Sequence, residues 1–101
     1  MEEQITDKNR LVPKFSLGRV VATPGALRAL AEANQSPFEF IERHQAGDWA
    51  ELCEEDQKEN EFSIRNDFRI LSAYRTRKNV KLRVITEADR SSTCLLLPQE
   101  Y

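Results

Sequence analysis

The sequence predicts a single-domain α+β protein whose helices pack on one face of an antiparallel β-meander. The first observation is length, because 101 residues suit one domain of ordinary size. The second is a series of helix starts in the first two thirds of the chain. The third is strand-like alternation in the last third. The predicted order is β-α-α-α-β-β-β, with a flexible leader over residues 1–13 and the domain over residues 14–101.

The first strand is predicted at Phe15–Ala22, where apolar side chains fall on both faces. A helix start follows at Thr23-Pro24, because threonine can accept a bond from a free backbone N–H and proline suits the first helical position. Asn34 can end this helix in a left-handed conformation. Ser36-Pro37 repeats the start pattern, and Gly47 is the natural end of the second helix.

A third helix is predicted from about residue 52 to 64, with acidic residues in its first turn, where the helix dipole is positive. Its apolar stripe is poor, so we expect it at the periphery. Three strands then complete the order, at Phe68–Thr76, Val80–Glu87 and Thr93–Leu97. Short polar connections between them are typical of hairpins.

The charges are sorted along the chain. Residues 51–61 hold six acids and one base, whereas residues 65–83 hold seven bases and one acid. A three-residue loop at 77–79 would place Arg75 opposite Lys81 in a hairpin, with Arg69 and Arg83 on the same outer face. This face is either an ordinary solvated surface or a site for RNA, DNA or an acidic protein. Base stacking is not indicated, because no series of aromatic residues accompanies the basic ones.

The densest polar cluster follows the second predicted hairpin strand. Arg90 could bind a phosphate or carboxylate, and Glu87 and Asp89 could transfer protons on a bound substrate. Ser91 and Ser92 add hydroxyl groups to this candidate hairpin surface. The alternative is plain turn chemistry, because Asp and Ser bond their own backbone in tight turns.

His44 is the only histidine, and Asp48 lies four positions further on. A carboxylate can orient an imidazole, but Gly47 separates the two, and nothing places a cysteine beside them. Trp49 is interpreted either as a binding residue or as a cap on the core. We predict no catalytic residues, no metal site and no cofactor, because two scattered cysteines and three glycines form no recognised ligand or phosphate-binding pattern.

Several runs carry a resemblance that covers nearly all of residues 15–101. They are VATPGALRAL from Val21, SPFEFIERHQAGDW from Ser36, EED from Glu54 with Asn60, RILSAY from Arg69 and ITEADRSSTCLLLPQEY from Ile85. These runs resemble a family of small bacterial proteins called plasmid-related proteins, which travel on plasmids and integrated mobile elements. Some members carry a restriction-enzyme-subunit label, although this chain has no methyltransferase cofactor motif. The resemblance adds weight to one shared surface comprising Glu87, Asp89, Arg90, His44, Asp48 and Trp49.

From these observations we expect a non-enzymatic accessory protein of a mobile genetic element that acts by binding another protein. The element order also resembles RelE-type toxins at the level of the fold, so a small ribonuclease is one alternative. A nucleic-acid-binding regulator that uses the basic face is another. No apolar run is long enough to span a bilayer, so we expect a cytoplasmic protein without membrane contact. It would be a monomer or a homodimer formed by edge-strand pairing.

Overall fold

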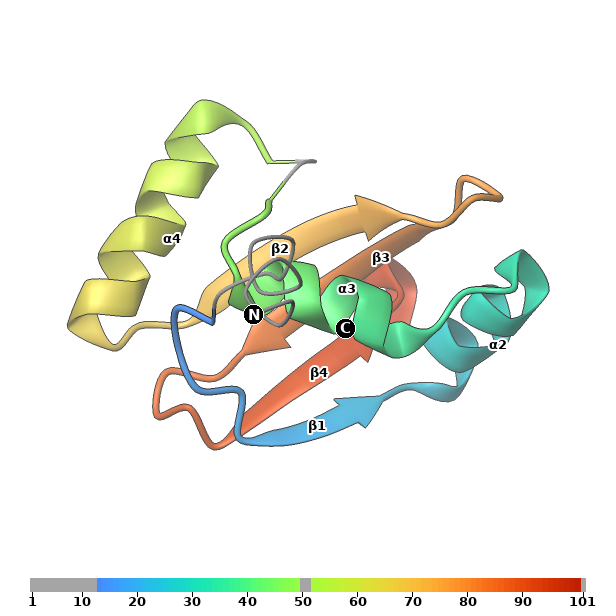
Figure 1. Ribbon diagram of the computed structural model, residues 1–101, viewed down its shortest axis with the longest axis horizontal. Coiled ribbons are helices and arrows are strands. Elements are labelled where there is room, and N and C mark those ends of the chain that lie inside the picture. Colours follow the sequence, from blue (N-terminus) through green and yellow to red (C-terminus); the bar gives the residue numbers. More distant parts are fainter. Residues whose placement is uncertain (1–12, 50–51, 101) are drawn as a thin grey trace, which may run out of the picture.

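The structure is a computed structural model that describes residues 13–49 and 52–100. It is an α+β fold with a four-stranded sheet and three helices, which confirms the predicted class (Figure 1). Residues 1–12 of the predicted leader lie outside the described residues. The elements are β1 (Arg19–Ala22), α2 (Pro24–Ala33), α3 (Pro37–Gln45), α4 (Glu54–Asn66), β2 (Ile70–Arg75), β3 (Lys81–Thr86), β4 (Ser92–Leu96) and the 3₁₀ turn η1 (Pro98–Glu100).

The sheet is mixed, so the prediction of an antiparallel sheet throughout is wrong. Strands β2, β3 and β4 form the predicted antiparallel meander, but β1 lies parallel to β4 in the strand order β1-β4-β3-β2. Three helices separate β1 from the meander along the chain, and such a long connection permits parallel pairing. The turn η1 was not predicted either.

The two predicted helix starts at threonine and serine are confirmed. The Thr23 hydroxyl accepts a bond from the backbone N–H of Ala26 at 3.2 Å, and Ser36 accepts one from Phe38 at 3.2 Å. Asn34 ends α2 with a φ of 57°, in the left-handed conformation predicted for it. These signals are local, so the chain specifies both helices within a few residues of each boundary.

The first strand is shorter than predicted because Gly18 interrupts it. Its φ is 65°, and a Cβ atom at this position would lie 2.4 Å from the carbonyl oxygen of Arg90. Only glycine tolerates both the conformation and the close approach. Strand β1 therefore begins at Arg19 instead of Phe15.

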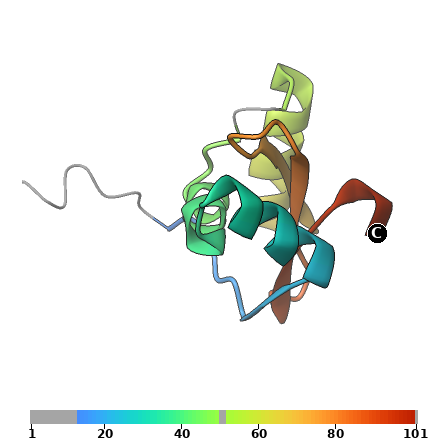
Figure 2. The ribbon, with the colours of Figure 1, turned by 90° about the vertical axis from the view of Figure 1, so that its right-hand side faces the viewer.

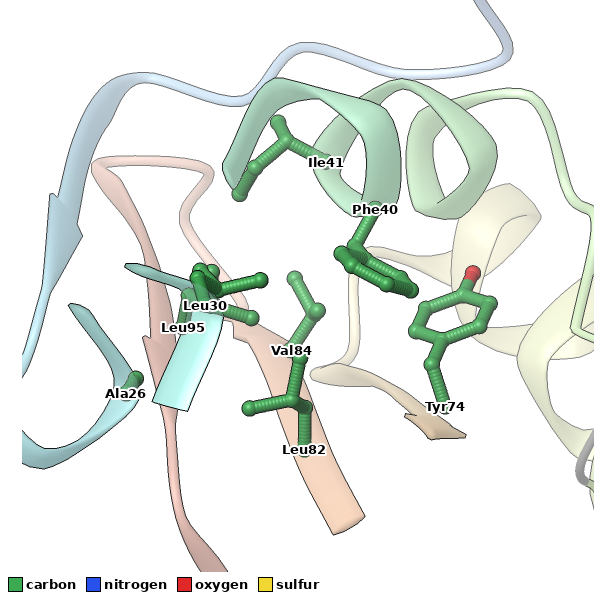
Figure 3. Packing of buried hydrophobic residues seen from close by; sticks show 8 residues of the cluster. All are labelled: Ala26, Leu30, Phe40, Ile41, Tyr74, Leu82, Val84 and Leu95. Carbon is green, nitrogen blue, oxygen red and sulfur yellow. The ribbon is translucent and has the colours of Figure 1, made fainter. Parts of the chain in front are cut away.

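The hydrophobic core lies between the sheet and the helices α2 and α3. Figure 3 shows side chains from both layers meeting there, including Leu30 from α2, Phe40 from α3 and Val84 from β3. Each fully buried side chain of this size contributes about 1.5–3 kcal/mol relative to its exposed state. The cluster comprises Ala26, Leu30, Phe40, Ile41, Tyr74, Leu82, Val84 and Leu95.

Helix α4 does not join the other two helices on that face. It runs beside β2 at the edge of the sheet (Figure 1), and its one buried residue is Asn60. The Asn60 amide donates to the carbonyl oxygen of Leu71 at 2.7 Å and accepts from the Leu71 N–H at 3.2 Å. One side chain therefore pairs with β2 as a neighbouring strand would. The predicted peripheral position of this helix is confirmed.

The second face of the sheet carries no described α-helix, although the short 3₁₀ helix η1 contacts β3 there. Figure 2 shows α2 and α3 on one side and, on the other, the C-terminal segment at one end of the sheet. The Glu100 carboxylate ties this segment to the start of α2, because it accepts bonds from the Gly25 N–H at 3.0 Å and from the Thr23 hydroxyl. We call the second face the open sheet face.

Candidate functional site

The predicted hairpin surface does not form one site, because two of its members are buried. His44 has no exposed surface, and Trp49 is only 3% exposed. Asp48 is exposed, and its carboxylate accepts a bond from the Arg43 guanidinium at 2.8 Å. The other members lie in or beside the turn between β3 and β4. A partner at that turn would not contact either buried ring.

His44 belongs to a chain of buried hydrogen bonds. The Thr93 hydroxyl donates to the carbonyl oxygen of Leu17 at 2.8 Å, so its oxygen accepts from Thr86 at 2.7 Å. The Thr86 oxygen then accepts from Nε2 of His44 at 2.8 Å, and Nδ1 accepts from the Ser72 hydroxyl. Every hydroxyl group and ring nitrogen in this chain has a hydrogen-bond partner when the neutral imidazole carries its proton on Nε2. The role of His44 is therefore structural.

Burial lowers the pKa of His44 to about 3, because a charged imidazole would lose its hydration inside the core. The ring of Phe15 packs edge-on against it, with 5.3 Å between ring centroids. Tyr74 lies in the same layer and donates to the carbonyl oxygen of Asp48 at 2.7 Å. Burial raises the pKa of Tyr74 to about 12. Both rings are thus held neutral.

Arg90 holds the β3–β4 turn against the end of α4. Its Nη1 donates to the carbonyl oxygens of Phe68 at 2.8 Å and Ala88 at 3.0 Å, and its Nη2 donates to Ser63 at 3.0 Å. Nη1 also lies 3.2 Å from the Glu87 carbonyl oxygen. These bonds direct the guanidinium to the protein's own backbone, where it stabilises the junction of two elements.

The rest of the turn forms the bonds expected of plain turn chemistry. The Asp89 carboxylate accepts from the Ser91 N–H at 3.0 Å, and bonds from Ser91 hold the pKa of this carboxyl below its usual value. The Glu87 carboxylate lies 3.6 Å from the Arg69 guanidinium, and both groups are exposed. Ser92 lies in β4 and is partly buried. The cluster closes the hairpin.

The open sheet face brings the predicted basic residues together. Arg75 pairs with Lys81, and Ala73 pairs with Arg83, in the register that the sequence predicts. Arg69 directly precedes β2, and the strand's alternation, continued by one residue, places it on the same side. Strand β1 adds Arg19, which the sequence analysis missed because it depends on the pairing of β1 with β4. We define the basic sheet face as Arg19, Arg69, Arg75, Lys81 and Arg83.

Apolar side chains occupy the middle of the same face. Ile85 and Leu96 alternate with the core residues of β3 and β4, but they are only 6% and 4% exposed, and η1 contacts β3 on this side. Val21 of β1 is 42% exposed, and Leu71 of β2 is 39% exposed. The exposed apolar surface of this face therefore lies on the two outer strands, among the basic residues.

Beside this face lies a shallow groove of about 150 Å³ between α4 and β2. Its wall contains two acids of α4, so it separates an acidic helix from a basic sheet face. The lining residues are Leu52, Asp56, Glu59, Asn60, Ser63, Arg69 and Leu71. Within residues 13–49 and 52–100, no three His, Cys, Asp or Glu side chains gather as metal ligands.

Sequence reasoning missed the buried polar chain, although a signal was present. Ser72 and Thr86 alternate with core residues of their strands, and Thr93 does the same in β4. On α3, His44 lies one turn beyond Phe40 and Ile41, which are buried. Polar residues at core positions of adjacent strands require a buried partner, and the only histidine could supply it.

Comparison with profiles of known protein families, with curated proteins and with solved structures found no match. No described helix is long and apolar enough to cross a membrane. The function proposed below therefore rests on the geometry of the open sheet face.

Proposed function

We propose that this protein is a non-enzymatic binding protein whose open sheet face receives an acidic segment of another protein. The observation that supports the proposal is the basic sheet face, which has exposed apolar side chains at Val21 and Leu71 among its charges. Protein interfaces combine apolar surface with polar surroundings, and complementary charge speeds association and selects the partner. The resemblance to plasmid-related proteins suggests an accessory of a mobile genetic element.

A protein partner suits this face better than a nucleic acid does. No aromatic side chain of the paired strand residues lies on this face, so unpaired bases would find no ring on the sheet itself to stack on. Val21 and Leu71 offer partly exposed apolar surface, which phosphates do not need. RNA or DNA held by its phosphates, including in a small ribonuclease, is the competing outcome of the test.

The test is an affinity pull-down of the tagged protein from a bacterial host lysate, with and without nuclease, read by mass spectrometry. A first variant replaces Arg75, Lys81 and Arg83 by Gln. A matched control variant replaces Arg28, Lys58 and Arg65 by Gln, which removes the same charge from exposed helix positions.

The proposal predicts a specific protein that survives nuclease treatment, is retained by the control and is lost by the first variant. Circular dichroism of both variants checks that the fold is intact. Capture that disappears with nuclease would replace the protein partner by a nucleic acid, and growth arrest on expression would point to the ribonuclease. If the first variant still captures the protein, the basic sheet face is not the surface that binds it.

A further inference from the structure

The outer edge of β1 presents backbone groups that no described strand pairs with. The Arg19 N–H donates to the carbonyl oxygen of Ser91, directly before β4, at 3.0 Å, and the Thr23 N–H donates to that of Leu95 in β4 at 3.0 Å. Backbone groups alternate in direction along a strand, so those of Val20 and Ala22 point away from β4. Among the residues that the structure describes, β1 is the last strand of the sheet on this side.

Among the described residues, this edge has little protection against pairing beyond its shortness and the charge of Arg19 at its start. Residues 20–22 contain no charge and no proline, and Val20 and Val21 are 40% and 42% exposed. Natural edge strands are commonly shielded by charges, prolines, bulges or a covering element. The opposite edge has such an element, because Asn60 of α4 occupies the backbone groups of Leu71. The edge at β2 is therefore shielded by α4, whereas the edge at β1 keeps outward backbone groups that no described strand pairs with.

We propose that β1 pairs antiparallel with β1 of a second copy of this chain, about a two-fold axis at Val21. In this register Val20 faces Ala22 of the second copy, and the outward backbone groups of both residues bond across the axis. Arg19 faces Thr23 of the second copy, so no like charges meet. The register is self-complementary, and a two-fold axis closes the assembly at two copies.

The pairing joins two sheets into one and keeps both open sheet faces on the same side. The two Val21 side chains then meet on that side, where each is now partly exposed. The dimer does not depend on the proposed function. If both hold, the dimer presents two basic sheet faces to one partner, and linked sites bind more tightly than separate ones.

A short edge strand buries little surface, so we expect a dimer that dissociates on dilution. Stable interfaces commonly bury about 1,200–2,000 Å² in total, more than two four-residue strands provide. The association should resist salt, because its bonds are between backbone groups. Contact between the acidic α4 and a basic sheet face of another copy would weaken with salt instead.

The test is sedimentation equilibrium of the full chain from micromolar to millimolar concentration. Val20→Pro removes an outward N–H and leaves the bonds to β4, whereas Val21→Lys places two positive charges at the axis. The matched control is Val21→Thr. We expect dimers of the wild type and of the control, and monomers of the other two variants with unchanged circular dichroism.

Amide hydrogen exchange gives a second readout that locates the interface. Exchange at Val20 and Ala22 should slow as the concentration rises, while exchange at Leu71 stays constant. A wild type that is monomeric at millimolar concentration would overturn the proposal. So would a dimer that Val21→Lys leaves intact, or protection of Val20 that does not change with concentration.

Discussion

Acid should destabilise this protein through one buried ring, His44. In the folded state its pKa is about 3, against 6.5 for an unperturbed histidine. The unfolded chain therefore binds one proton more than the folded chain between these values. Stability is complete above pH 6.5 and falls as the pH drops towards 3.

The size of the effect follows from the same two values. One pKa unit corresponds to 1.36 kcal/mol, so the free energy of unfolding should fall by about 2 kcal/mol between pH 7 and pH 5. His44 is the only histidine, and this window lies above the ordinary pKa of Asp and Glu side chains. Since small domains are stable by about 5–15 kcal/mol, a change of this size is readily measured.

The assay is urea unfolding at several pH values, followed by the fluorescence of the single, buried Trp49. The control is His44→Gln, because a side-chain amide can accept from Ser72 and donate to Thr86 but does not titrate. The slope between pH 7 and pH 5 should be present in the wild type and absent in this variant. An imidazole that titrates near pH 6.5 by NMR, or an equal slope in the variant, would refute the reasoning.

Three further predictions concern stability in urea at neutral pH. Arg90→Lys should cost about 2 kcal/mol, because an ammonium group cannot reach the carbonyl oxygens that the guanidinium joins, and an unchanged midpoint would contradict this. Asn60→Ala should cost about 1–3 kcal/mol and speed amide exchange at Leu71, whose backbone it leaves unpaired; equal exchange rates would argue against the edge pairing. Gly18→Ala should cost about 2 kcal/mol or more, since the positive φ and the contact with a backbone oxygen both exclude a Cβ atom, and a neutral result would contradict the close approach of Gly18 to Arg90.

The sequence predicted best what depends on neighbouring residues. The caps at Thr23 and Ser36 act within a single helical turn. The opposition of Arg75 and Lys81 follows from loop length and strand alternation. The basic sheet face could be assembled from these local rules, apart from Arg19.

What the sequence did not predict depends on distant partners. The parallel pairing of β1 with β4 joins residues about 73 positions apart, and no local pattern encodes it. Arg90 binds backbone oxygens, which every residue has, so its partners leave no trace in the sequence. The sequence left open whether His44 is a surface or a packing residue, because its partners Ser72 and Thr86 come from two strands that lie 28 and 42 positions away in the chain.

The most direct test of the central claim is site-specific photo-crosslinking in a bacterial host. A photoreactive amino acid replaces Leu71 on the open sheet face or, as the matched control, Leu27, which is exposed on α2. We predict that the probe at position 71 crosslinks one acidic protein and that the probe at position 27 does not. Crosslinks from position 27 alone, or crosslinks from position 71 only to nucleic acid, would contradict a protein partner at the open sheet face.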